Sequence, residues 1–191
     1  MTAIDISAFT SKISDRELEE LCHKNPETRF ETTKEGKLII MSPTGSMSGK
    51  FNMSLAAQVW NWNNKTKLGI VFDSSTGFKL ANGAVKSPDV SWIELSHWNS
   101  LSEKQQRKFA PIAPDFVIEL VSPTDDITEL QQKMAEYLDC GVKLGWLIDP
   151  DEKQVEIYRQ GKEKEILDNP HSLSGENVLP DLTVDLTDIF A

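Results

Sequence analysis

The segment that most constrains the fold of this chain is residues 114–121, with the sequence PDFVIELV. An apolar run of this kind is typical of a strand that other elements cover on both faces. It nevertheless contains two acids, Asp115 and Glu119. A second stretch, residues 87–90 with the sequence SPDV, brings Asp89 into another strand of the same kind. Because an unpaired buried carboxylate is costly, buried acids are usually paired or bound to a metal. Two such acids on neighbouring strands predict a divalent-metal site and metal-assisted hydrolysis, with a nuclease as the leading hypothesis.

Strand geometry decides which acids can share one cation. Asp115 and Glu119 lie on one face of their strand but are roughly 13 Å apart, at about 3.3 Å per residue. Ligands of one hard cation lie within about 5 Å of each other. Asp89 comes from another strand, and nothing in the spacing prevents it from lying beside Glu119. The predicted metal pair is therefore Asp89 with Glu119, while Asp115 is expected to be a strand-entry residue or a hydrogen-bonding group. The alternative for Glu119 is an acid in solvent on an edge strand.

Three further polar side chains are candidates for the same site. Lys133 lies on the flank of the apolar stripe of a predicted helix, from which it could reach the strand of Glu119. A lysine there would neutralise charge on a phosphate or orient a water. The alternative is a surface lysine whose stem covers apolar residues. Gln131 lies on the opposite flank of the stripe and could help to bind a phosphate. Glu31, on a predicted hairpin near the N-terminus, is a weaker candidate.

The order of predicted elements indicates a mixed sheet flanked by helices. A capping box at Ser14 and Glu17 predicts a short first helix, and a hairpin follows at residues 28–41. Two longer helices are predicted, over residues 47–65 and from about 125 to 140. Strands are predicted at residues 70–72, 77–80, 84–93, 115–121, 144–148 and 154–159. This order of helix, strands, helix and strand belongs to the α/β or α+β class.

Length, charge and the N-terminus set further limits. The 191 residues fit one domain over residues 1–191. The net charge of −10 argues against non-specific binding to a polyanion, yet residues 46–110 carry eight basic residues against four acids. The middle of the chain could therefore present a basic face. The N-terminus has no basic region followed by an apolar run, and no apolar stretch approaches about 20 residues. A cytoplasmic protein without a membrane partner is expected.

Short motifs recur in an order that resembles a known family. They are residues 30–31 (FE), 35–36 (EG), 41–43 (MSP), 82–83 (NG), 87–90 (SPDV), 114–123 (PDFVIELVSP), Lys133, Tyr137 and 141–142 (GV). Each motif is weak alone, but the ordered set resembles a bacterial restriction endonuclease domain family, formerly a domain of unknown function. That family is grouped with the PD-(D/E)xK nuclease superfamily. The resemblance covers about residues 14–190.

The resemblance implies a restriction-endonuclease-like fold with an αβββαβ core, preceded here by the helix and hairpin. It also implies Mg²⁺-dependent hydrolysis of phosphodiester bonds in DNA, with Mn²⁺ as a substitute. Asp89 and Glu119 match the motif acids and would hold the metal together with the backbone carbonyl of Leu120. The superfamily lysine would stand at Val121, so the resemblance implies that Lys133 on the following helix replaces it.

Two rival hypotheses stay open at this point. The first is a catalytically inactive nuclease-fold module for protein or nucleic-acid interaction, which the net charge and Val121 favour. The second is a nuclease acting on RNA or on structured DNA. Gly49 stands in the region where related sequences often carry a histidine, so no role is assigned to such a histidine. Relatives of this fold often dimerise, and a homodimer also stays open.

Overall fold

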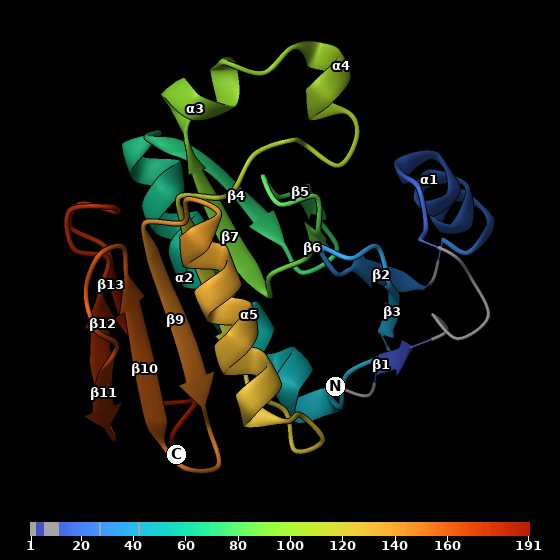
Figure 1. The fold of residues 1–191 in the computed structure, drawn as a ribbon. Coiled ribbons are helices and arrows are strands. Elements are labelled where there is room, and N and C mark those ends of the chain that lie inside the picture. Colours follow the sequence, from blue (N-terminus) through green and yellow to red (C-terminus); the bar gives the residue numbers. More distant parts are fainter. Residues whose placement is uncertain (1–2, 6–11, 27, 42) are drawn as a thin grey trace.

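The computed structural model describes residues 3–5, 12–26, 28–41 and 43–191. Ser42, the first residue of the loop predicted before the long helix, lies outside them. A larger and a smaller β-sheet stand side by side, and the long helices lie against the larger one (Figure 1). None of the helices in these ranges is long and apolar enough to cross a membrane.

The larger sheet is mixed and has the strand order β11-β10-β9-β8-β7-β4. Its strands are β4 (Gly69–Asp73), β7 (Val90–Glu94), β8 (Phe116–Leu120), β9 (Leu144–Asp149), β10 (Gln154–Arg159) and β11 (Glu165–Asp168). Strands β8 and β9 are parallel, and their other neighbours in the sheet are antiparallel. A parallel pair needs a long crossover connection, which a helix supplies here. The order helix, β4, β7, β8, helix, β9 confirms the predicted αβββαβ core.

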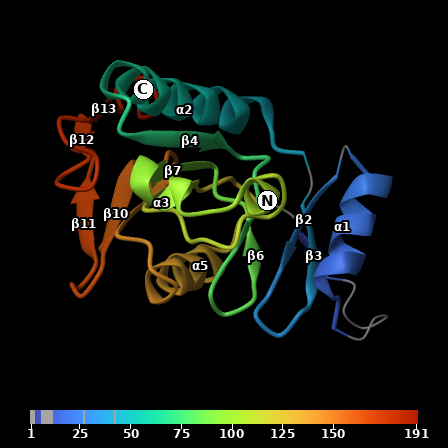
Figure 2. The ribbon, with the colours of Figure 1, turned by 90° about the horizontal axis from the view of Figure 1, so that it is seen from above.

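Two helices cover opposite faces of this sheet (Figure 2). They are α2 (Ser46–Thr66) and α5 (Ile127–Asp139). The first face of β8 packs in one hydrophobic cluster with α2, through Phe116, Ile118, Leu120, Leu55 and Val59. The second face packs in another cluster with α5, through Val117, Met134 and Tyr137. The alternation of β8 is therefore as predicted, and it turns Glu119 toward α5.

The smaller sheet has the strand order β1-β3-β2-β6-β5. Its strands are β1 (Ala3–Asp5), β2 (Arg29–Thr32), β3 (Leu38–Met41), β5 (Phe78–Lys79) and β6 (Val85–Lys86). The predicted N-terminal hairpin forms β2 and β3, and Gly83 with a φ of 93° turns the chain between β5 and β6. Strand β1 was not predicted.

The strand predicted over residues 84–93 is wrong as a single element. It divides into β6 of the smaller sheet and β7 of the larger sheet. Pro88 lies at the break. A proline cannot donate a hydrogen bond to the ladder, and it restricts the backbone of the residue before it. The chain therefore leaves one sheet and enters the other here, which places Asp89 at the junction between them.

The remaining elements surround this core. The capping box of Ser14 and Glu17 opens α1 (Asp15–Lys24), as predicted. Helix α1 packs against β2 and β3 in a separate cluster around Leu18 and Phe30. The other elements are α3 (Leu95–Asn99), α4 (Glu103–Gln106), β12 (Ser172–Ser174) and β13 (Thr183–Asp185).

Candidate active site

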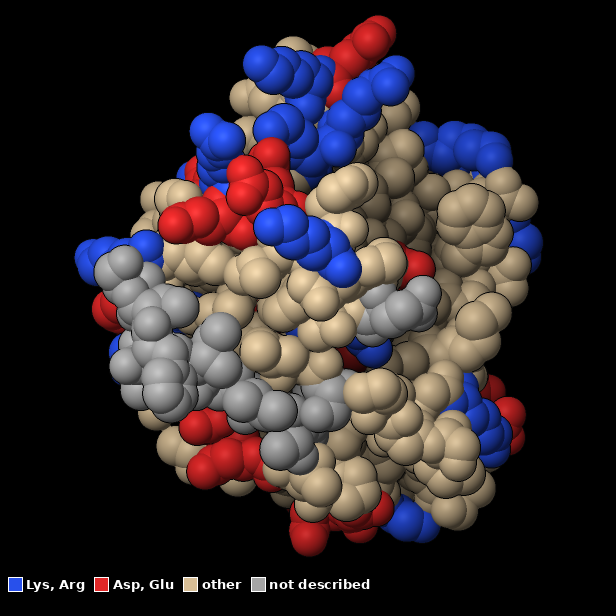
Figure 3. Space-filling model, turned by 90° about the vertical axis from the view of Figure 1, so that its right-hand side faces the viewer, with Lys and Arg blue, Asp and Glu red and all other residues tan. Residues whose placement is uncertain are grey.

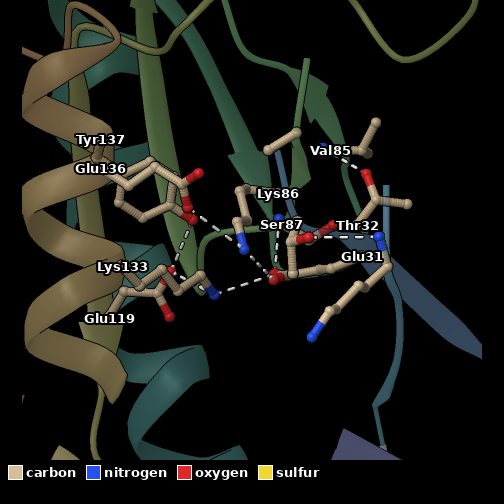
Figure 4. A network of polar contacts seen from close by, with 12 residues as sticks. Glu31, Thr32, Val85, Lys86, Ser87, Glu119, Lys133, Glu136 and Tyr137 are labelled. Carbon is tan, nitrogen blue, oxygen red and sulfur yellow. Dashed lines mark hydrogen bonds and ion pairs between the residues drawn. The ribbon is translucent and has the colours of Figure 1, made fainter. Parts of the chain in front are cut away.

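Acids and lysines form a cluster in the space between α5 and the smaller sheet (Figure 4). Lys133 of α5 places its Nζ 2.8 Å from Oε1 of Glu119 on β8 and 3.0 Å from Oε1 of Glu31 on β2. Glu31, Asp89 and Glu119 are all buried. Elements that lie far apart in the sequence therefore converge on one charged site.

The face of β8 and the period of α5 explain this meeting. Lys133 and Tyr137 are one helical turn apart, so both side chains lie on the face of α5 that covers β8. The Tyr137 hydroxyl donates a hydrogen bond of 2.8 Å to Oε1 of Glu119. Glu119 is thus held by a cation and a phenol from the same helix. Tyr137 was predicted only as part of the apolar stripe.

Asp89 approaches the same place from the junction between the sheets. The backbone N–H of Leu120 donates to its Oδ2 at 2.9 Å, and the Asn52 side chain donates to its Oδ1 at 2.9 Å. The Asp89 carboxylate therefore lies beside the residue that follows Glu119. The structure brings the two acids of the sequence-predicted pair together, while Asp115 lies at the other end of β8.

Glu31 has a larger place in the cluster than the sequence indicated. The Ser87 backbone N–H donates to its Oε1 at 2.9 Å, and Lys86 Nζ lies 3.7 Å from its Oε2. Lys86 also lies 3.5 Å from Oε2 of Glu136, so it bridges two carboxylates. Lys86 was not among the site residues predicted from the sequence.

Burial and charge together set the protonation of these groups. Burial raises the pKa of Glu119 to about 7, against the opposing effect of Lys133. Burial also raises the pKa of Asp89. Burial acts on Glu31 too, but Lys133, Lys86 and the Ser87 amide outweigh it and lower its pKa. Burial would lower the pKa of Lys133, yet the charges of Glu119 and Glu31 raise it above its usual value, so this lysine stays protonated.

Gln131 is not brought to this cluster. It lies on the opposite flank of α5, where its side-chain amide donates to Oε1 of Glu156 on β10 at 2.6 Å. The helical wheel placed Gln131 on its flank correctly, but the neighbour that covers this flank comes from β10. Its amide is therefore committed to a carboxylate rather than free for a phosphate.

A second group of ligand-type residues lies at the opposite end of β8. This group offers three ligand atoms within 4.8 Å of one another, one each from Glu94, His97 and Asp115. Asp115 Oδ1 lies 3.0 Å from Nδ1 of His97 and 2.9 Å from Nζ of Lys143, and its Oδ2 accepts the Glu94 backbone N–H at 2.8 Å. This group is a rival metal position, and Lys143, which also lies 3.8 Å from Oε2 of Glu94, brings a positive charge to both of its acids.

A small cavity of about 140 Å³ opens beside the first cluster. Its lining includes Glu31, Lys86, Glu119 and Lys133. A larger hollow of about 790 Å³ lies away from the acids, between α1 and α4. Basic residues line it, namely Arg16, Lys79, Lys104 and Lys108. Figure 3 shows Lys and Arg gathered at the top of this face with acidic side chains beside them, and two of the lysines pair with Asp15 and Glu19.

Comparison with known proteins agrees with the resemblance drawn from the motifs. Residues 15–187 match the model of the Uma2 family, which is described as "Putative restriction endonuclease". A crystal structure of "a putative nuclease belonging to DUF820" from Anabaena variabilis is similar, with a TM-score of 0.72 and 24% sequence identity. The alignment covers 84% of this chain and 89% of that one, so the two share a fold. No curated protein matches the chain.

Proposed function

The chain belongs to the Uma2 family of restriction-endonuclease domains, and we propose that it is a Mg²⁺-dependent endonuclease that hydrolyses phosphodiester bonds of DNA. The observation that supports this proposal best is the buried cluster in which Glu119 and Glu31 pair with Lys133 while Asp89 accepts the N–H of Leu120, the residue after Glu119. Buried charges need partners, and these carboxylates outnumber the lysines that reach them. A divalent cation would supply the missing positive charge.

The donor atoms of the cluster suit a hard cation. Asp89 and Glu119 offer carboxylate oxygens, and the backbone carbonyl of Leu120 is the third ligand in the proposal. Mg²⁺ prefers such oxygen ligands, and Mn²⁺ accepts the same set. The buried Oδ1 of Asn52, beside Asp89, has no hydrogen-bond partner among the residues that the structure describes. Carboxylate charge and an unpaired oxygen acceptor in one place fit a bound cation. Such a cation activates a water and neutralises charge on the phosphate.

Lys133 would act as a cation rather than as a base. The neighbouring Glu119 and Glu31 raise its pKa, so its Nζ has no free pair to accept a proton. It can donate hydrogen bonds to a phosphate oxygen or hold an attacking water. Val121 packs with α5 in the second hydrophobic cluster. The in-strand position of a superfamily lysine is thus apolar here, and Lys133 reaches the carboxylates from the helix instead.

The rival reading is an inactive module with the same fold. The observation that favours it is that Lys133 already pairs with both Glu31 and Glu119. A cation would have to share Glu119 with this lysine. Metal binding separates the two readings, because an inactive module has no need of Mg²⁺ at Asp89.

The test is cleavage of plasmid and oligonucleotide DNA with Mg²⁺ or Mn²⁺. We expect Asp89→Asn and Glu119→Gln to lose at least about 100-fold in rate, since even outer-shell changes at metal sites cost about 10–100-fold. Asp115→Asn is the matched control, a buried acid of the same strand outside the cluster. Equal rates in all four proteins, or no cleavage and no Mg²⁺ binding by the wild type, would contradict the proposal. RNA and branched DNA belong in the same assay to define the substrate.

The proposal extends to a cytoplasmic location and a homodimer. Cys22 and Cys140 are both free thiols, which suits a reducing compartment. Met53 and Trp60, one above the other on α2, are among the exposed large apolar side chains. Light scattering coupled to size-exclusion chromatography tests the assembly, and a monomer at every concentration would contradict the homodimer.

A further inference from the structure

Asn52 of α2 has a contact that the proposed reaction does not yet use. Its Nδ2 donates a hydrogen bond of 2.9 Å to Oδ1 of Asp89. Its own Oδ1 is buried and has no hydrogen-bond partner within the described ranges. Buried side-chain oxygens in native proteins almost always have a partner. The carbonyl of Asn52 is therefore open to a partner that the described residues do not provide.

The orientation of this amide follows from its neighbour. Exchanging its nitrogen and oxygen would place the Asn52 carbonyl against the Asp89 carboxylate, and both groups only accept hydrogen bonds when the acid is ionised. Asp89 Oδ2 already accepts the backbone N–H of Leu120. The nitrogen of Asn52 must therefore face Asp89, and its oxygen must face away from it.

The helix presents more than one oxygen to this region. Ser48 lies one turn before Asn52, so both share one face of α2. Ser48 is buried, and its hydroxyl lies 3.2 Å from that of Ser122, which stands two residues after the end of β8. The N-terminal half of α2 thus turns neutral oxygen donors toward the end of β8 at which Asp89 and Glu119 meet.

We propose that Asn52 is a further residue of the metal site, whose carbonyl oxygen binds the cation or one of its waters beside Asp89. This inference rests on the proposed function. An amide carbonyl is a hard oxygen ligand of the kind that Mg²⁺ and Mn²⁺ accept. The same side chain orients Asp89 through its nitrogen, so Asn52 both positions a charged ligand and adds a neutral one.

Two substitutions test the role, and a third is their control. Asn52→Ala removes the oxygen together with the nitrogen that donates to Asp89, and Asn52→Asp replaces the amide with a carboxylate of the same shape. Asn61→Asp adds the same charge at an exposed position of the same helix. The readouts are calorimetric titration with Mg²⁺ and thermal unfolding with and without Mg²⁺, neither of which depends on cleavage.

The expected results follow from charge. Asn52→Ala should weaken Mg²⁺ binding about tenfold. Asn52→Asp should unfold at a lower temperature than the wild type without metal, because two carboxylates then face each other. Mg²⁺ should raise its melting temperature by more than it raises that of the wild type, since the cation gains a charged ligand. Asn61→Asp should behave as the wild type in both measurements.

Each other outcome has a definite meaning. If the wild type and Asn52→Ala bind Mg²⁺ equally, or if Mg²⁺ stabilises Asn52→Asp no more than the wild type, Asn52 only holds Asp89 in place and the inference is wrong. If Asn52→Asp does not fold, the titration of Asn52→Ala decides. If the wild type binds neither Mg²⁺ nor Mn²⁺, or if Asp89→Asn binds as the wild type does, the proposed function fails and the inference fails with it.

Discussion

The two ends of strand β8 each bury an acid, yet they treat it differently. Asp115 is 3% exposed and Glu119 is 2% exposed. Asp115 is neutralised by Lys143, whose side chain is 41% exposed, and it accepts a backbone N–H. Glu119 shares a lysine that is only 11% exposed with a second buried carboxylate, Glu31. The partners of Asp115 are therefore half-exposed, whereas Glu119 lies among partners that are themselves buried.

The difference teaches that burial alone does not mark a reactive acid. What separates the two ends is the burial of the partners, because Lys143 and its second acid, Glu94, are 41% and 45% exposed, whereas Lys133 and its second acid, Glu31, are 11% and 3% exposed. Burial, together with the neighbouring charges of Asp89 and Glu31, raises the pKa of Glu119 to about 7. Such perturbed groups cluster at functional sites more often than elsewhere. The rival position at Asp115 has His97 and Glu94 as neighbours, so experiments on both ends can decide between them.

The largest contrast should come from removing the lysine at each end. Lys133→Met leaves buried carboxylates without their cation and should cost about 3–5 kcal/mol of unfolding free energy. Lys143→Met removes a half-exposed partner and should cost less than about 1 kcal/mol. Urea unfolding without metal, at a pH of about 8, measures both. Equal losses of unfolding free energy would mean that the two acids depend equally on their lysines. Mg²⁺ should restore part of the stability of Lys133→Met and none of that of Lys143→Met.

Substitutions of the acids at the two ends should differ in their effect on Mg²⁺ affinity, by a somewhat smaller free energy than the lysine substitutions differ in stability. Asp89→Asn should weaken Mg²⁺ binding by at least about 100-fold, near 2.7 kcal/mol, because it removes a charged ligand. Asp115→Asn should leave the affinity within about twofold, since this acid lies at the end of β8 opposite Glu119. Calorimetry on the purified proteins measures both constants. The reverse order of effects would move the metal to Glu94, His97 and Asp115.

The pH dependence of stability should report on Glu119 directly. Its ordinary pKa is 4.5 and its folded pKa is about 7, so the folded protein keeps a proton that the unfolded chain releases. Stability is then fully present below the unfolded pKa and is lost as pH rises through the folded one. From a pH of about 5 to about 7.5, the metal-free wild type should lose about 2 kcal/mol more than Glu119→Gln. Urea midpoints across this range measure the difference.

The affinity for Mg²⁺ should change with pH in the direction opposite to the stability of the metal-free protein. A cation binds the ionised carboxylate, so binding releases the proton of Glu119. Mg²⁺ affinity should therefore rise with pH up to about 7 and level off above it. An affinity that does not change below this pH would mean that Glu119 is not a ligand.

Much of this contrast followed from local sequence patterns. The rise per residue along a strand separated Asp115 from Glu119, and the capping box, the hairpin turn at Gly83 and the helix carrying Lys133 follow from short-range rules. The division at Pro88 did not follow, because a proline is also compatible with an edge position or a bulge within one strand. Lys86, on the other side of this break, reaches the cluster from the smaller sheet.

The remaining features depend on contacts between distant segments. Glu31 became central because the smaller sheet stands opposite α5, and no local pattern indicates how two sheets are placed. The apolar stripe of α2 identifies only the residues that face the core, so it gives no indication of a role for Asn52. Gln131 lies on the predicted flank of α5, but its neighbour there is Glu156 of the later strand β10 rather than a phosphate site. Polar contacts across elements are set by the assembled fold.

The smallest contrast concerns the hydrogen-bond donors beside each acid. Tyr137→Phe removes a buried hydroxyl that donates to Glu119 and should cost about 1.5 kcal/mol, because hydrogen bonds to charged groups are worth about 1.5–3 kcal/mol. His97→Ala removes a half-exposed partner of Asp115 and should cost less than about 0.5 kcal/mol. Urea unfolding compares the two. Tyr137→Phe should also raise the pKa of Glu119 further, since a donor to the ionised carboxylate is lost. The pH at which Mg²⁺ affinity levels off should therefore move upward in this variant, and no shift would mean that the phenol only fills space beside Glu119.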